Sequence, residues 1–462
     1  MDAVITLMRN MVQTEYEAIP DSAIEVTKKE ILDCLGVALA GSAAQGVREL
    51  VELSREWGGR GQSSVIYHGM KLPAPNAAQV NATMIHALDF DDTHDTAVMH
   101  PGAVTVTTGF ATAERQGGIH GKALLTAVTL GTDLMCRFGL ATNPGGSRLK
   151  AGWHFTAIFG YLGAAAVAGK ILALDEDKMV NGLGIAYHQS AGNGQCVIDG
   201  ALTKRMGPGF AAKGGIIAAL MAEKGITGAK NCLEGEMGMY NLYHRGTYEP
   251  EELMAELGKR YEGINLSFKP YPSCRATHPF IDAALSLARD HDIQTDRIDM
   301  ITVFHGQGAK ILCEPLEIRR RPRNAVDSQF NIPWVVAVAI AKRQVAIHDF
   351  TEAGIRDEAV LEVSGKIIPR FAESLKRPAL EPGRVEIKTK NGKVFSCQVD
   401  DPSGSPANPM TFDDCVRKFF DCAAHAARQI PKDHLDRVVE MVGRLERMDD
   451  ATEVIRLVSS TS

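Results

Sequence analysis

The spacing of apolar residues changes twice along this chain of 462 residues, and that change limits the fold more than any other feature. Up to about residue 265, apolar residues recur at helical spacing, whereas residues 297–306 and 384–399 alternate apolar and polar side chains as strands do. Helical spacing returns after a connector rich in Pro, Gly and Ser at 401–410. The sequence therefore predicts a mainly α protein with one small β-containing region inside it.

Many of the predicted helices are rich in Ala and Gly, and small side chains let helix axes approach closely. Helices are expected at 22–40, 74–88, 102–115, 121–140, 155–173, 176–191, 209–224 and 250–258, and again at 331–342, 412–428 and 431–447. A β-hairpin is expected at 384–399, around Asn391-Gly392, a pair that suits a type I′ turn.

Both ends of the chain are predicted to be helical, and the length favours more than one domain. The simplest arrangement is a discontinuous helical domain of residues 1–266 and 406–462. An α+β domain of residues 267–405 would then be inserted before the C-terminal helices. A cleft between two such domains is a natural place to bind a ligand.

The overall charge is mildly acidic, because 50 Lys and Arg against 56 Asp and Glu give a formal net charge of −6. This balance provides no general attraction to nucleic acids or anionic membranes, so neither partner is expected. A substrate with several negative charges would need a local cluster of Lys, Arg and His. The nine cysteines include no C-x-x-C pair, which argues against a disulfide framework and favours the reducing cytoplasm.

Two further features bear on secretion and membranes. The N-terminal residues lack a basic stretch followed by an apolar one, so no secretory signal is expected. The most membrane-like stretch, residues 155–168, is too short to span a bilayer and predicts a buried helix instead.

The densest polar segment is HALDFDDTHDTAVMHPG, residues 86–102, which lies between two predicted helices. Its aspartates could simply cap helices and face solvent. Its side chains also suit a metal-dependent hydrolase, but no recognised metal-binding spacing is present, so no metal is assigned. Alternatively, contacts between carboxylate and imidazole can prepare a histidine for acid–base catalysis. The segment alone leaves these three interpretations open.

Three other segments contain isolated candidates. His154 precedes an apolar helix, where a histidine more commonly caps the helix or lies in the core. Lys204 lies in a Gly-rich segment before a helix of small residues, where it can form part of an anion site, although lysines usually face solvent. Residues 268–279, FKPYPSCRATHP, are either a linker stiffened by prolines or a third set of candidates. That set is Lys269, Cys274, Arg275 and His278.

Together and in this order, these segments resemble the MmgE/PrpD family. The resemblance extends over nearly the whole chain and rests on HALDFDDT with HPG after it, GWH at 152–154, TKRMGPGFAAKGG, KPYPSC with a following His, and SQFNIP at 328–333. The family includes 2-methylcitrate dehydratases, cis-aconitate decarboxylases and an iminodisuccinate epimerase. The resemblance implies a large helical domain with a smaller α+β lid domain, an active site between them, a homodimer, and no metal or organic cofactor.

The resemblance also implies which residues form the site. The catalytic positions fall on Asp89, His100, His154, Lys204 and Lys269. Thr93 is a further site position, expected to bind substrate, and the weaker candidates for substrate binding are Arg205, Cys274, Arg275 and His278. In some decarboxylases of the family a histidine stands five residues after the equivalent of Lys269, whereas this chain has Cys274 there.

Such a site fits proton transfer next to a carboxylate of a small di- or tricarboxylic acid. Loss of that proton adds charge to a group that is already anionic, and fixed cations such as Lys204 and Lys269 would lower the barrier. His100 and His154 are expected to act as base and acid, in an order that the sequence leaves open. We therefore expect a lyase resembling 2-methylcitrate dehydratase. The alternatives are a cis-aconitate decarboxylase, an iminodisuccinate epimerase, a metal-dependent hydrolase and a non-catalytic carboxylate-binding protein.

Overall fold

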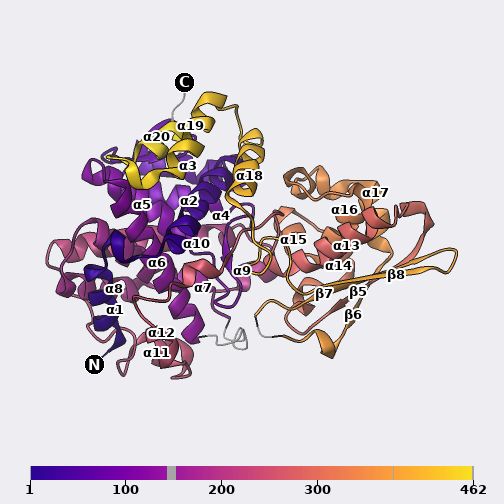
Figure 1. Ribbon diagram of the computed structural model, residues 1–462, viewed down its shortest axis with the longest axis horizontal. Helices are drawn as coiled ribbons and strands as arrows, with labels where there is room; N and C mark the ends of the chain where they lie inside the picture. Colours follow the sequence, from indigo (N-terminus) through magenta and orange to yellow (C-terminus); the bar gives the residue numbers. More distant parts are fainter. Residues whose placement is uncertain (1, 143–151, 378, 460–462) are drawn as a thin grey trace.

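The computed structural model describes residues 2–142, 152–377 and 379–459. Its described residues form a mainly α protein with two visibly different parts (Figure 1). The helical part contains α1–α12 and α18–α20, and the sheet part contains α13–α17 and β5–β8. The chain leaves the helical part for the sheet part after β4 and returns with α18, so both termini lie on the helical part.

The helical part is built from helices of very different lengths. They are α1 Ala3–Gln13, α2 Asp21–Gly41, α3 Val47–Trp57, α4 Ala74–His86, α5 Gly102–Gln116, α6 Gly121–Thr142, α7 Phe155–Ile171, α8 Glu176–Gln189, α9 Gln195–Asp199, α10 Thr203–Glu223, α11 Met239–His244, α12 Pro250–Met254, α18 Phe412–Ala424, α19 Lys432–Gly443 and α20 Glu453–Ser459. Two short antiparallel strand pairs accompany them, β1 Ser63–Val65 with β2 Met70–Leu72, and β3 Thr93–His94 with β4 Leu266–Ser267.

Helices from both ends of the chain share one hydrophobic core. Phe419 of α18 and Val442 of α19 are buried in the same cluster as Leu35 of α2 and Val104 of α5. The C-terminal helices therefore pack against the N-terminal ones, although the sheet part separates them in sequence. The division at residues 266 and 406 into two domains, and the role of the second domain as a lid, stay predictions.

Helices α7 and α10 approach closely because glycines lie at their contact. A Cβ added at Gly215 would lie 2.3 Å from the Cβ of Ala164, and one at Gly160 would lie 2.8 Å from the Cβ of Ala211. Such distances are far below van der Waals contact, so larger residues would push the two helices apart. This contact matters for function because His154 immediately precedes α7 and α10 begins at Thr203.

The sheet part surrounds one four-stranded sheet of order β6-β5-β7-β8. Strand β5 pairs parallel to β6 and antiparallel to β7, and β7 pairs antiparallel to β8. The strands are β5 Ile298–His305, β6 Ile367–Phe371, β7 Gly383–Thr389 and β8 Val394–Val399, and the helices are α13 His278–Asp290, α14 Leu316–Arg320, α15 Ala325–Gln329, α16 Ile332–Lys342 and α17 Glu358–Gly365. This part has a hydrophobic core of its own, in which Trp334 and Ile301 are fully buried.

Most predicted elements are confirmed within a few residues, but two details are wrong. The helix expected at 209–224 begins six residues earlier as α10, so Lys204 lies in its first turn and Pro208 lies inside it. The hairpin turn is not type I′. Among the described residues Gly392 has a φ of +83°, while Asn391 does not adopt a positive φ. The loop has three residues, with the amide of Gly392 donating to the carbonyl of Thr389, which is a type I turn followed by a left-handed glycine.

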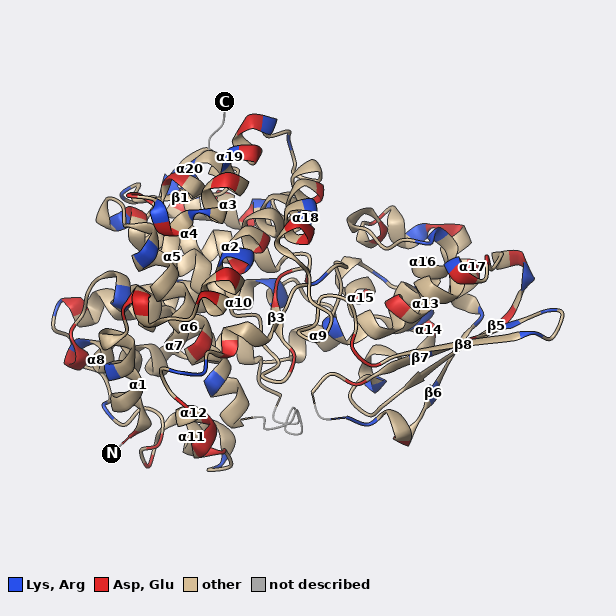
Figure 2. Cartoon of the chain, viewed as in Figure 1, with Lys and Arg blue, Asp and Glu red and all other residues tan. Residues whose placement is uncertain are grey.

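The stretch predicted as a buried helix at 155–168 is confirmed as α7, which is buried along nearly its whole length. The longer helix α6 is the one described helix long and apolar enough to cross a membrane, but it lies in the core of the helical part. Outer helices such as α18 contain both acidic and basic residues (Figure 2). None of the nine cysteines, all of which are described, forms a disulfide.

Candidate active site

The pairing of β3 with β4 brings two of the candidate segments together. Thr93 pairs with Ser267, so the polar segment that follows α4 lies beside the chain that leads to Lys269. The first turn of α10 supplies Lys204 from a third direction. Three segments that are distant in sequence therefore meet at one point between the helical part and the sheet part.

Asp89 lies where the three segments meet. Lys204 Nζ donates to one carboxylate oxygen of Asp89, and Lys269 Nζ donates to the other at 2.9 Å and to the Asp89 carbonyl at 2.7 Å. Asp89 adopts a left-handed backbone with a φ of +51°, which aspartate tolerates better than most residues. Unusual backbone of this kind collects at functional sites, where neighbouring contacts hold it in place.

The two lysines and Asp89 stabilise one another's charges. Burial alone would raise the pKa of Asp89, but Lys204 and Lys269 outweigh it and hold that pKa well below its usual range. Burial alone would lower the pKa of Lys269, but Asp89 and Asp91 outweigh it and raise that pKa. Lys269 is fully buried, whereas the Lys204 side chain is 8% exposed and reaches the edge of the site.

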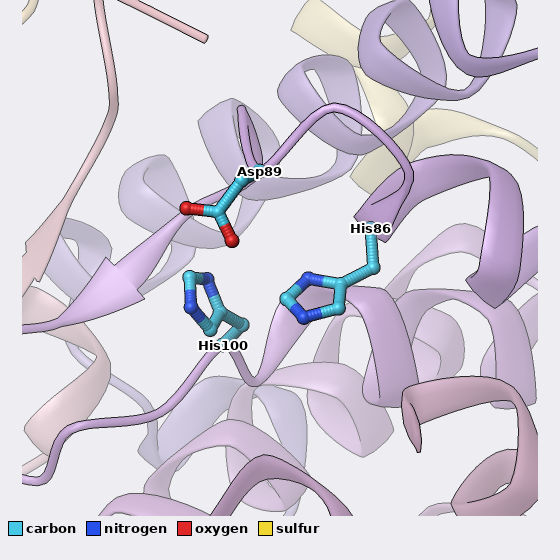
Figure 3. A group of neighbouring side chains, drawn as sticks. All are labelled: His86, Asp89 and His100. Carbon is cyan, nitrogen blue, oxygen red and sulfur yellow. The ribbon is translucent and has the colours of Figure 1, made fainter. Parts of the chain in front are cut away.

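Three imidazoles lie around this charged centre. The ring of His86 lies 4.6 Å from that of His100 and 6.0 Å from that of His154, measured between centroids. Lys204 Nζ contacts His86 Nε2 at 2.9 Å. Figure 3 shows His86, Asp89 and His100 converging from the end of α4 and the loop that follows it. We call His86, Asp89, Asp91, His100, His154, Lys204 and Lys269 the lysine–histidine cluster.

Burial and the neighbouring lysines keep these imidazoles neutral. Burial, then Lys204 and other cations, lowers the pKa of His154 to about 3. Burial is also the largest cause of the lowered pKa of His86 and of His100. Neutral imidazoles can accept a proton, and the negative charge of a bound polycarboxylate would make them easier to protonate.

The sheet part adds two side chains to the site. The ring of Phe330, from the SQFNIP segment, lies 4.9 Å from Lys204 Nζ, a cation–π distance. Cys274 lies close enough to Asp89, Lys269 and Lys204 to interact with their charges, and burial raises the pKa of its thiol. The site is therefore lined from both parts of the molecule.

Arg275 and His278 form a different network next to the site. The Arg275 guanidinium donates to the Ser403 carbonyl at 2.9 Å and to His278 Nδ1 at 3.1 Å, and lies 3.4 Å from Asp95. His278 Nε2 faces the Ser273 carbonyl at 3.2 Å. We call Asp95, Arg275 and His278 the arginine network. Their contacts hold the chain around 402–403 in place, and give no support for the predicted binding of substrate.

Thr93 and Arg205 also have structural partners. The Thr93 hydroxyl donates to the Met99 carbonyl at 3.1 Å, which ties the two ends of the loop that carries His100. Arg205 donates to the Gln45 carbonyl at 2.8 Å, and burial lowers the pKa of its guanidinium to about 10 although Asp89 acts in the opposite direction. The guanidinium stays charged at neutral pH and adds positive potential near Asp89.

A layer of buried carboxyl groups lies beneath the cluster. Asp92 accepts from the Gly102 amide at 3.1 Å, and burial, with Asp91 and Asp33 adding to it, raises its pKa to about 8. Lys418 of α18 pairs with Asp33 at 2.7 Å and donates to the Phe90 carbonyl at 2.7 Å. Helix α18 therefore anchors Phe90, the residue next to Asp89.

The positions of His86, Asp89 and His100 would also suit a metal ion, because one ligand atom of each lies within 4.8 Å of the others. However, both carboxylate oxygens of Asp89 already face ammonium groups, and Lys204 also occupies Nε2 of His86. A divalent cation here would lie beside two positive charges. The arrangement of these residues favours an anion.

A cavity of about 520 Å³ between the two parts is lined by His94 of β3 but by no residue of the lysine–histidine cluster. It is lined by five acidic residues, Asp95, Glu252, Glu262, Asp400 and Asp401, against two arginines, Arg260 and Arg377. This excess of negative charge is unsuited to a polycarboxylate. The lysine–histidine cluster fits such a substrate better.

Two family models match most of the chain. The MmgE/PrpD N-terminal domain matches residues 6–251, and the MmgE/PrpD C-terminal domain matches residues 271–443. The chain belongs to the MmgE/PrpD family. The match to the C-terminal domain includes α18, which in this MmgE/PrpD protein packs into the core of the helical part.

Relatives of this MmgE/PrpD protein match it along almost its full length. It is 26% identical over 460 residues to a cis-aconitate decarboxylase of Aspergillus terreus, which covers 96% of this chain and 92% of that protein. It is 27% identical to the human cis-aconitate decarboxylase, covering 96% and 91%, and 27% identical to the cis-aconitate decarboxylase-like protein oryM of Aspergillus oryzae, covering 96% and 94%. None of these three is named a dehydratase, which was the main expectation from the sequence.

Sequence reasoning missed His86, Asp91 and Phe330 as members of the site. His86 is the last residue of α4 and lies three positions before Asp89, so the helix end places both toward the same side. That spacing was a usable signal. Phe330 lies in the SQFNIP motif, but nothing in the sequence pairs it with Lys204, because that contact crosses between the two parts of the molecule.

Proposed function

We propose that this protein is a lyase that acts on a small di- or tricarboxylic acid by proton transfer next to a carboxylate, without a metal or an organic cofactor. The observation that carries the proposal is the pair of buried lysines on Asp89, surrounded by three neutral imidazoles, in a protein that is acidic overall. Cations fixed in this way attract a polyanion, and the negative charge of the bound polyanion raises the pKa of the neutral imidazoles, so that they can accept a proton.

The chemistry requires stabilisation of negative charge. When a carbon next to a carboxylate gains an electron pair, the charge spreads onto the carboxylate oxygens, which is very unfavourable in water. Lys204 reaches the edge of the site and can donate to that carboxylate, while Lys269 beneath it keeps the positive charge in place through Asp89. One donor of this kind contributes about 3–4 kcal/mol to lowering the barrier.

The first substrate to test is cis-aconitate, because relatives that cover over nine-tenths of this chain are named cis-aconitate decarboxylases. In that reaction the bond to the departing carboxylate breaks, and its electron pair moves into the unsaturated system next to a remaining carboxylate. Carbon dioxide leaves as that bond breaks, and a histidine that has been protonated in the complex donates its proton to the carbon that received the electron pair. His100 and His154 are the candidates for this donor.

Dehydration of 2-methylcitrate is the second candidate. Cys274 favours it, since some decarboxylases of the family have a histidine at that position. In dehydration a neutral histidine removes the proton first, and a second acid protonates the departing hydroxyl. The neutral state of the imidazoles in the unliganded site suits such a base.

Proton NMR in deuterated water separates these reactions in one assay. The purified protein in EDTA is mixed in turn with cis-aconitate, 2-methylcitrate and iminodisuccinate. Loss of carbon dioxide with deuterium in the product indicates a decarboxylase, loss of water indicates a dehydratase, and exchange at carbon without either indicates an epimerase. The proposal fails if no substrate changes, or if activity requires a divalent metal.

We further propose a homodimer in the cytoplasm in which residues 267–405 act as a lid domain over the site. The lining of the site by Phe330 and Cys274 supports a closing movement of the sheet part. Light scattering on the purified protein tests the dimer: a mass near 100 kDa, twice the chain's 49.9 kDa, is expected, and a monomer would contradict it.

A further inference from the structure

We infer that Asp91 is a positioning residue that fixes the proton on Nδ1 of His86 and places a negative charge beside Nδ1 of His100, leaving Nε2 of His100 as the atom that exchanges protons with substrate. The identity of that substrate rests on the proposed function, whereas the positions of the protons do not.

His86 shows the first half of this arrangement. Its side chain is fully buried, with Nδ1 2.7 Å from Asp91 Oδ2 and Nε2 2.9 Å from Lys204 Nζ. An ammonium group only donates, so Nε2 must accept and carries no proton. The carboxylate only accepts, so Nδ1 must carry the proton. Asp91 thereby makes Nε2 of His86 the acceptor that orients Lys204.

His100 shows the second half. Its Nδ1 lies 2.9 Å from the Asp92 carbonyl, which can only accept, so Nδ1 carries the proton here too. Among the described residues Nε2 of His100 has no hydrogen-bond partner, and the side chain is 15% exposed. Nε2 is therefore free to take up a proton from a bound molecule. The carboxylate of Asp91 lies 3.6 Å from Nδ1 and stabilises the imidazolium that results.

The Asp91 carboxylate therefore lies beside both His86 and His100, whose ring centroids are 4.6 Å apart. Charged and titratable groups lie around His86, His100 and Asp91 on every element packed against these three residues. They are Asp89 and Asp92 of the same loop, Asp33 and Cys34 of α2, His154 before α7, Lys204 and Arg205 of α10, Lys269 after β4, and Lys418 of α18. The lysines oppose protonation of His100, and Asp91 is the neighbour that most favours it.

Nitrogen NMR on the wild-type protein with ¹⁵N-labelled histidine tests the proton positions without any substrate. We expect both His86 and His100 to be neutral with the proton on Nδ1 at pH 7.5, assigned by the loss of each signal in His86→Gln and His100→Gln. A proton on Nε2 of either ring would overturn the inference. This result is independent of activity, so it stands even if the proposed function fails.

The second test compares Asp91→Asn with Asp92→Asn, which changes the adjacent buried carboxyl in the same way. We expect Asp91→Asn to lower kcat at least about tenfold with little change in KM, because an amide cannot hold one tautomer or stabilise the imidazolium. Without the negative charge of Asp91 the pKa of His100 should fall, so the part of the kcat–pH profile that reports on His100 should move to lower pH. In Asp92→Asn, kcat should stay within about threefold and that part of the profile should stay in place. Equal behaviour of the two variants would overturn the inference.

Discussion

The lysine–histidine cluster and the arginine network lie side by side, are made from the same kinds of residue and are equally buried, yet they differ in what their polar atoms do. In the arginine network, Arg275 donates to His278 and to the Ser403 carbonyl, and His278 donates to the Ser273 carbonyl, so both side chains hold the chain in one conformation. In the cluster, the lysines and imidazoles contact one another around Asp89, and Nε2 of His100 has no partner among the described residues. In the cluster an imidazole nitrogen is left for a bound molecule, whereas in the arginine network the nitrogens of Arg275 and His278 hold the backbone.

The difference also concerns charge. A guanidinium that contacts neutral carbonyls fixes geometry, since each carbonyl has a permanent position in the backbone. In the cluster, Lys204, Lys269 and the adjacent Arg205 carry three positive charges against the two negative charges of Asp89 and Asp91, which leaves an excess of one positive charge. A polyanion can respond to that excess, whereas in the arginine network the charges of Arg275 and Asp95 cancel.

The largest expected effect is on turnover in the cluster. Lys204→Ala should lower kcat at least about a hundredfold, because it removes the donor nearest to the substrate and leaves Asp89 with one cation. His100→Ala should do the same, because it removes the proton carrier. Steady-state kinetics measure this, with circular dichroism as the check that the fold is intact. Wild-type rates in either variant would contradict the assignment of the lysine–histidine cluster as the active site.

The opposite outcome is expected in the arginine network. Arg275→Ala should lower the free energy of unfolding by about 3 kcal/mol, because the Ser403 carbonyl, His278 and Asp95 lose a buried partner. Turnover per folded molecule should fall only a few-fold. Urea denaturation followed by fluorescence gives the stability. A hundredfold loss of turnover at unchanged stability would place Arg275 in the binding machinery after all.

The carboxyl layer beneath the cluster predicts a dependence of stability on pH. The native state keeps a proton on Asp92 up to about pH 8, whereas the unfolded chain releases it near pH 4. Native stability therefore falls as pH rises through this window, by at most about 1.4 kcal/mol per pH unit. Asp92→Asn should remove this contribution, so its stability relative to wild type should improve steadily between pH 5 and 8. A constant difference over that range would contradict the raised pKa.

The smallest effect is the stabilisation by a bound polyanion. Tricarballylate at ten times its dissociation constant should stabilise the wild-type protein by about 1.4 kcal/mol, which raises Tm by about 2 °C. The shift should persist in Arg275→Ala and disappear in Lys204→Ala. Differential scanning fluorimetry measures it. A shift that disappears only in Arg275→Ala would reverse the comparison.

Local pattern was enough to predict much of the fold. The helices at 74–88 and 102–115 follow from apolar spacing, and they appear as α4 and α5 within two residues. The start of α10 could not be predicted in this way, because Gly207 and Pro208 are poor helix formers. Their place in the helix comes from tertiary packing: a Cβ at Gly207 would lie 3.0 Å from Nδ1 of His154, so the contact requires a residue without a side chain.

For the site, the sequence predicted the candidate segments but not which of their residues lie together. The segment that contains Lys269 also contains Arg275 and His278, and nothing in its residue types separates them. Lys269 turns toward Asp89, 180 positions earlier in the chain, while Arg275 turns toward Ser403, 128 positions later. Partners at such distances leave no periodic signal in the sequence.

The sequence by itself therefore determined the mainly α composition, the family, and the residue types from which a polycarboxylate site can be built, because helical spacing and short motifs are local properties. Only the tertiary structure decided which of those residues share one site, which instead support the backbone, and which groups face the ring nitrogens of His86 and His100. Hydrogen bonds and ion pairs act over about 3 Å in space, and the folded chain alone sets which residues lie that close.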